Sequence, residues 1–181
     1  IWTSDNTDAL DTVYIQFGTS MCYPASTMGA HVSACDRESY ETKGNVAMWG
    51  TFGYELDPRK LTDGEKELVK KQVRDYHKYY SLIRKGDLYR IVSPFENKFR
   101  CAWLIASSDK SEALFTLVTL ISENNPTVYI KMKGLAPDKF YTCSLDSNVY
   151  SGAYLMNSGL DLTYESDDDA QSLVIYFKEV L

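Results

Sequence analysis

Several signatures are missing from this sequence, and each absence excludes a class of protein. The longest apolar stretches, such as Trp103 to Ala106, fall far short of the roughly 18 residues that a membrane-spanning helix requires. Lys and Arg are nowhere concentrated enough to hold a phosphate backbone, and the net charge is −6. The G-x-S-x-G elbow, the Walker loop, G-x-G-x-x-G and H-E-x-x-H are all absent. We therefore expect no membrane and no nucleic acid as a partner.

Cysteine and histidine are also scarce, which argues against a metal centre. The two histidines lack the neighbouring ligands that a zinc site needs, and no C-x-x-C pair occurs. We expect reduced, half-buried thiols and a cytoplasmic location, with a secreted protein carrying one disulfide bond as the alternative. The four cysteines are widely spaced, at Cys22, Cys35, Cys101 and Cys143.

The composition that remains is that of a packed globular protein. Of 181 residues, 44% are hydrophobic and 24% are charged, which suits one ordinary domain or two small adjoining ones. The chain opens at Ile1 without a positively charged region and apolar run of the signal-peptide kind. We expect it to be a fragment of a longer protein.

Up to about Gly86 the sequence alternates between extended and helical patterns. Apolar residues at helical spacing predict a first helix that begins near Thr7 or Asp8. Small and β-branched residues then predict two buried strands of the parallel kind, with a short helix between them. These elements are predicted at 28–34, 45–49 and 51–56.

The most strongly marked helix is predicted at 62–85. Thr62 and Glu65 form a capping box, in which each side chain accepts a hydrogen bond from a free backbone N–H group. Gly86 is predicted to end the helix in the left-handed conformation. The residues of the predicted buried face follow at steps of three and four, at Val69, Val73, Tyr76, Tyr80 and Ile83.

Beyond Gly86 the hydrophobic period changes from helical to two, which is the period of a strand. In the last of these runs, odd- and even-numbered side chains should face opposite sides of a sheet. Turn clusters separate the runs, and this spacing predicts an antiparallel sandwich. The predicted strands are 87–92, 100–107, 113–122, 127–133, 140–145 and 173–178.

The densest polar cluster, residues 3–8, lies where a short extended segment passes into the first helix. One interpretation is helix capping, because Asp, Asn, Ser and Thr are the preferred N-caps. The other is a catalytic carboxylate at the carboxyl end of a parallel strand, where active sites of βα folds lie. Asp8 is the better cap, whereas Asp5 lies closer to the strand end and to Trp2, so Asp5 is the catalytic candidate.

The histidines are weaker candidates. His31 lies in a strand of small residues and fits a satisfied core position better than a catalytic one, although a nearby pocket would keep the second interpretation open. His77 lies among charged residues of the long helix and should be exposed.

Five blocks of the sequence carry a family resemblance. They are Ile-Trp-Thr-Ser-Asp-Asn-Thr-Asp-Ala-Leu at 1–10, Ile-Gln-Phe-Gly-Thr-Ser at 15–20, Met-Gly-Ala-His-Val-Ser at 28–33, Trp-Gly-Thr-Phe-Gly-Tyr-Glu-Leu-Asp at 49–57 and Gly-Asp-Leu-Tyr-Arg at 86–90. In this order the blocks resemble the α-galactosidases of glycoside hydrolase family 36. The residues after Cys35 depart from the Pro-Asn-His-Gln that is usual in that family.

The resemblance implies an α/β part followed by an all-β part. Residues 1–86 would be the last strands and helices of a (β/α)8 barrel, from about the sixth strand to the eighth helix. Residues 87–181 would be a C-terminal antiparallel β-sandwich domain. Five barrel strands would lie on a part of the enzyme that precedes this chain.

The resemblance also implies a retaining hydrolase of terminal α-linked galactose, as in melibiose and raffinose-type sugars. Asp5 aligns with the general acid/base, and Trp2 would border the galactose pocket. The family nucleophile lies in a Lys-Trp-Asp motif that this sequence does not contain, so the isolated chain should be inactive. No cofactor or metal is implied, and the complete enzyme would be a homotetramer. The alternative is a non-catalytic β-sandwich module for sugar binding or subunit association.

Overall fold

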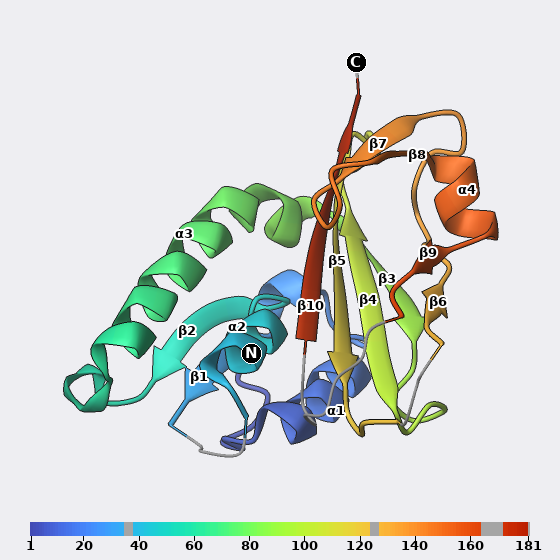
Figure 1. Cartoon of the computed structure of the whole chain (residues 1–181). Helices are drawn as coiled ribbons and strands as arrows, with labels where there is room; N and C mark the ends of the chain where they lie inside the picture. The colour runs from blue at the N-terminus through green and yellow to red at the C-terminus, as the bar shows by residue number, and fades with distance from the viewer. Residues whose placement is uncertain (35–37, 124–126, 164–171, 181) are drawn as a thin grey trace.

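The computed structural model describes residues 1–34, 38–123, 127–163 and 172–180. Its first half holds two parallel strands with helices around them (Figure 1). Strands β1 and β2 pair in register, with Ala30 opposite Phe52 and Val32 opposite Tyr54. The elements of this half are α1 (Ala9–Thr19), β1 (Gly29–Ser33), α2 (Tyr40–Ala47), β2 (Thr51–Glu55) and α3 (Asp63–Lys85), with 3-10 turns at Ala25–Thr27 and Pro58–Lys60.

The second half is built on a six-stranded antiparallel sheet with the strand order β3-β4-β5-β10-β7-β8. A separate pair, β6 and β9, lies beside it together with the short helix α4 (Figure 1). The elements are β3 (Asp87–Val92), β4 (Arg100–Ala106), β5 (Glu112–Thr119), β6 (Tyr129–Ile130), β7 (Phe140–Cys143), β8 (Val149–Ser151), α4 (Gly152–Asn157), β9 (Leu160–Asp161) and β10 (Ser172–Glu179).

Both faces of the large sheet are buried, against different partners. Alternate residues of β4 show this: Trp103 and Ile105 pack against the helices of the first half, whereas Leu104 packs toward β6, β9 and α4. In β10, Ile175 likewise belongs to the second core, while Tyr176 packs against the first. The period-two pattern predicted for this half is therefore confirmed, and the sheet lies between two cores, one of them shared with the helices of the first half.

Several element boundaries differ from those predicted. The second helix begins at Tyr40 instead of Asn45, because Ser39 caps it by accepting a hydrogen bond from Thr42 N at 3.2 Å. The strand predicted at 127–133 is limited to β6, since its pairing with β9 covers two residues only. The short elements β8, α4 and β9 were not predicted.

The predicted buried face of α3 is partly wrong. The capping box of Thr62 and Glu65 is present, but Val73 and Tyr80 are exposed. The buried residues of the helix are Gln72, Leu82 and Ile83. Gln72 is buried because its amide has partners there: it accepts from the Tyr54 hydroxyl at 2.8 Å and donates to Tyr40 O at 2.5 Å.

The predicted left-handed conformation of Gly86 is also wrong. Its φ is −75° and its ψ is 162°, so the residue is extended and not left-handed. The reason for glycine is space: a Cβ atom there would lie 2.6 Å from Leu82 O and 2.8 Å from Ala106 O. None of the helices in the described ranges combines the length and apolar character that crossing a membrane demands.

Candidate active site

The first seven residues run beside β1 in the same direction. Gly29 N donates to Ile1 O at 2.6 Å, and the Thr3 hydroxyl donates to Gly29 O at 2.9 Å. Further along, the Ser33 hydroxyl donates to Thr7 O at 2.5 Å. Residues 1–7, β1 and β2 therefore run side by side in the same direction, and their carboxyl ends meet at one edge.

The two aspartates of the polar cluster have different environments at this edge. Asp8 is the N-cap of α1, and its carboxylate accepts from Leu10 N at 2.9 Å and from Asp11 N at 3.0 Å. The capping interpretation is thus confirmed for Asp8. Asp5 is exposed, and its Oδ1 accepts from Trp2 Nε1 at 2.6 Å. Asp5 is therefore held by an indole N–H and not by the amides of a helix end.

Trp2 is positioned by two residues of β1, His31 and Gly29. Its indole stacks on the imidazole of His31, with ring centroids 5.0 Å apart and an interplanar angle of 2°. The backbone below is Gly29, where a Cβ atom would lie 3.0 Å from Ile1 O and 3.4 Å from Trp2 Cε3. Glycine at this position lets the segment of residues 1–7 and the indole approach β1 closely.

His31 is half-buried, and the expectation of a satisfied core histidine is only partly met, because its surroundings are polar as well as aromatic. The side chain is 8% exposed, and its Nε2 lies 3.2 Å from Glu55 Oε2. That nitrogen makes no hydrogen bond with the described part of the chain. Sequence reasoning missed Glu55, although period two places it on the same face of β2 as Gly53, which is the register partner of His31.

The arrangement brings together the two predicted site residues, Asp5 and Trp2, and adds His31 and Glu55. An exposed carboxylate with one hydrogen-bond donor can give up or accept a proton at a ligand that reaches it. An exposed indole beside it offers an aromatic surface of the kind that contacts a sugar ring.

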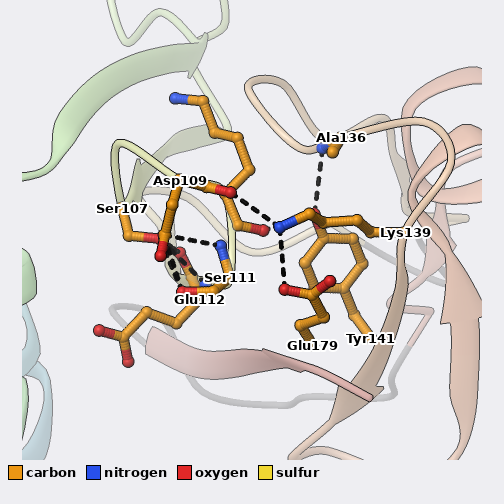
Figure 2. Close-up of polar contacts among 9 residues, drawn as sticks. Ser107, Asp109, Ser111, Glu112, Ala136, Lys139, Tyr141 and Glu179 are labelled. Carbon is orange, nitrogen blue, oxygen red and sulfur yellow. Dashed lines mark hydrogen bonds and ion pairs between the residues drawn. The ribbon is translucent and has the colours of Figure 1, made fainter. Parts of the chain in front are cut away.

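A second polar cluster lies in the β half, around the turn between β4 and β5 (Figure 2). Asp109 accepts from the hydroxyls of Ser107 and Ser111, both at 2.7 Å, within the turn between β4 and β5. Lys139 ties that turn to the end of β10 through Glu179 at 2.9 Å. The hydroxyl hydrogen bonds hold the pKa of Asp109 well below its usual range. Because the Asp109 carboxylate is bonded within its own turn and Lys139 is paired with Glu179, we interpret the cluster as structural.

The remaining sequence candidates do not contribute to the site. His77 is exposed on α3, as predicted. Cys22, Cys101 and Cys143 are free thiols, with Cys22 exposed and the other two buried, and Cys35 lies outside the described residues. Across the described ranges, no three His, Cys, Asp or Glu side chains are grouped so as to hold a metal ion.

Comparison with known proteins assigns both halves of the chain. Residues 1–86 match the Melibiase family model, and residues 100–177 match the Glycosyl hydrolase family 36 C-terminal domain. The chain belongs to glycoside hydrolase family 36. Among its family 36 relatives is alpha-galactosidase AgaA of Geobacillus stearothermophilus, which is 45% identical over 174 residues. The match covers 92% of this chain and 24% of AgaA.

The family relationship extends to a second curated protein and to solved structures. The bifunctional alpha-galactosidase/sucrose kinase AgaSK of Mediterraneibacter gnavus is 44% identical over 90% of this chain and 18% of AgaSK. The crystal structure of AgaA superimposes with a TM-score of 0.94 at 43% identity, over 98% of this chain and 25% of that one. A variant of AgaA has been solved in complex with raffinose. The family 36 chain described here thus spans about a quarter or less of the length of these relatives.

Proposed function

We propose that this chain is the C-terminal part of a retaining α-galactosidase in which Asp5 is the general acid/base. The observation that carries the proposal is the position of Asp5: an exposed carboxylate at the carboxyl edge of parallel segments, held by Trp2 Nε1 at 2.6 Å and not used as a helix cap. Trp2, which is exposed to solvent, would border the galactose pocket. The substrates would be terminal α-linked galactosides of the melibiose and raffinose type.

In this reaction two carboxylates share the work. One attacks the anomeric carbon, while the other protonates the departing oxygen and then deprotonates the water that releases the sugar. In retaining enzymes these carboxylates lie about 5–5.5 Å apart. Asp5 would do the proton transfers, and the attacking carboxylate would come from the N-terminal part of the same enzyme, because the sequence contains no Lys-Trp-Asp motif.

The proposed architecture follows from the same edge. Residues 1–7, β1 and β2 would be the sixth, seventh and eighth strands of a (β/α)8 barrel, with α3 as its eighth helix, within a unit of residues 1–86. The three segments are parallel and consecutive, and helices connect them, which supports this assignment. Residues 87–181 would be the C-terminal β-sandwich domain.

The complete enzyme would act without a cofactor, because side chains supply both the charge stabilisation and the proton transfer. We further propose a homotetramer and a cytoplasmic location. The partners would be the galactoside substrate and the N-terminal part of the same polypeptide.

The test is to assay the full-length protein and the 181-residue chain side by side with melibiose and raffinose. We expect the full-length protein to release galactose, with α-galactose as the first anomer seen by NMR, and the chain alone to release none. Initial release of β-galactose would overturn the retaining mechanism. Galactoside binding by the full-length protein without any hydrolysis would instead support the non-catalytic sugar-binding module.

A further inference from the structure

Four side chains form a continuous series of contacts that ends at Asp5. Glu55 Oε2 lies 3.2 Å from His31 Nε2, the His31 ring stacks on Trp2, and Trp2 Nε1 donates to Asp5 Oδ1 at 2.6 Å. The residues come from three neighbouring segments: residues 1–7, β1 and β2. Each contact joins one segment to the next or lies within the first.

The indole needs this support because it is otherwise open to solvent. Trp2 is 59% exposed, so the ring has few packing contacts to fix its side-chain torsions. A parallel ring contact favours one plane for the ring over the others. The 2° angle between the Trp2 and His31 rings means that the imidazole sets the plane in which Nε1–H points at Asp5.

The imidazole in turn is fixed by its strand and by Glu55. His31 is nearly buried, at 8% side-chain exposure, under the indole that covers it. Its Nε2 finds no hydrogen bond among the described residues, and the carboxylate of Glu55 lies 3.2 Å from it. Glu55 lies on the same face of β2 as Gly53, the register partner of His31, so its side chain is on the side of the sheet where His31 lies.

We propose that His31 and Glu55 are positioning residues, which hold the Trp2 indole and through it orient the Asp5 carboxyl toward the departing sugar oxygen. Neither residue touches the substrate in this account. The inference rests on the proposed function, because it gives a role to these two side chains only if Asp5 transfers the proton. Displacing a catalytic group by about 1 Å can cost on the order of 10²-fold in rate.

A leaving-group comparison in the full-length enzyme tests this role. The variants are His31→Ala, His31→Phe and Glu55→Gln, and the substrates are melibiose, whose leaving oxygen needs a proton, and p-nitrophenyl α-galactoside, whose leaving group does not. We expect His31→Ala to lower kcat/KM for melibiose by roughly 10²-fold and to affect the aryl galactoside much less. His31→Phe keeps a ring that can stack and should restore most of the loss.

Glu55→Gln should give a smaller loss with the same dependence on leaving group, and it should have no further effect in the His31→Phe background, where the contact with Nε2 is gone. His77→Ala removes the other histidine of the chain, exposed on α3, and should leave both substrates unaffected.

Equal losses on the two substrates, or no rescue by His31→Phe, would overturn the positioning role while leaving the α-galactosidase intact. Absence of hydrolysis by the unsubstituted full-length protein would overturn the proposed function, and this inference with it.

Discussion

Trp2 donates its indole N–H to Asp5 Oδ1 at 2.6 Å, and this contact separates Asp5 from the aspartate three positions later. The Asp8 carboxylate instead accepts hydrogen bonds from the first free amides of α1. Two acidic side chains of one short polar segment thus have different tasks. The consequences of each can be measured separately.

The first prediction concerns Asp8 as the N-cap of α1. Replacing Asp8 with Ala removes the acceptor for Leu10 N and Asp11 N, so the free energy of unfolding should fall by about 1 kcal/mol, the usual cost of losing an N-cap. Urea denaturation measures the change. Asp8→Ser can still accept from the amides and should retain most of the stability; a loss as large as that of Asp8→Ala would contradict the capping role.

Two glycines of the long helix region give a matched pair. Gly86→Ala should lower the free energy of unfolding by about 1–3 kcal/mol, the typical cost of overpacking, because the new Cβ would meet backbone oxygens at 2.6 and 2.8 Å. Gly64→Ala, in the first turn of α3 with nothing within 4 Å, should instead add up to about 1 kcal/mol. Thermal unfolding of both variants checks the prediction, which fails if the two changes have the same sign.

Tyr141 joins two loops from a fully buried position (Figure 2). Its hydroxyl accepts from Ala136 N at 3.0 Å and donates to Lys110 O at 2.8 Å. Tyr141→Phe leaves both backbone groups without this partner and should cost about 1–3 kcal/mol of stability in chemical denaturation. Tyr154→Phe, at an exposed tyrosine, is the control and should change stability by less than about 0.5 kcal/mol.

The thiols should differ in reactivity. Burial raises the pKa of Cys101 well above its usual range, and burial also raises the pKa of Cys143. A raised thiol pKa means less thiolate at any given pH, and the thiolate is the form that alkylates. Iodoacetamide near pH 8, close to the ordinary thiol pKa of about 8.5, should therefore label the exposed Cys22 before Cys101 and Cys143, as peptide mass mapping would show. Equal labelling of Cys101 in folded protein would contradict its burial.

Local signals were sufficient for the elements whose ends or faces they determine. The capping box at Thr62 and Glu65 marks the start of α3 correctly, because both of its hydrogen bonds are made within one turn. The alternation in β10 likewise identifies its two faces, since both are covered by apolar partners.

Tertiary contacts decide what the sequence pattern could not. Tyr80 continues the helical stripe of α3 yet is exposed, whereas the polar Gln72 is buried because it finds hydrogen-bond partners on other elements. The strands β8 and β9 and the helix α4 are too short for a period to appear, and they exist through pairing and packing.

The residues of the candidate site also differ in whether the sequence alone could identify them. Asp5 and Trp2 could be selected from the sequence, because a polar cluster follows an extended segment there. The contact between His31 and Glu55 depends on the register of β1 against β2, which no local pattern specifies.

The most direct test of the account is the substitution Asp5→Asn in the full-length enzyme, measured as kcat/KM on melibiose and on p-nitrophenyl α-galactoside. Asn is nearly isosteric but cannot donate the proton. If Asp5 is the general acid, the rate on melibiose should fall by roughly 10²–10⁴-fold, with a much smaller loss on the aryl galactoside. Equal losses on both substrates, or no loss on melibiose, would contradict the assignment of Asp5.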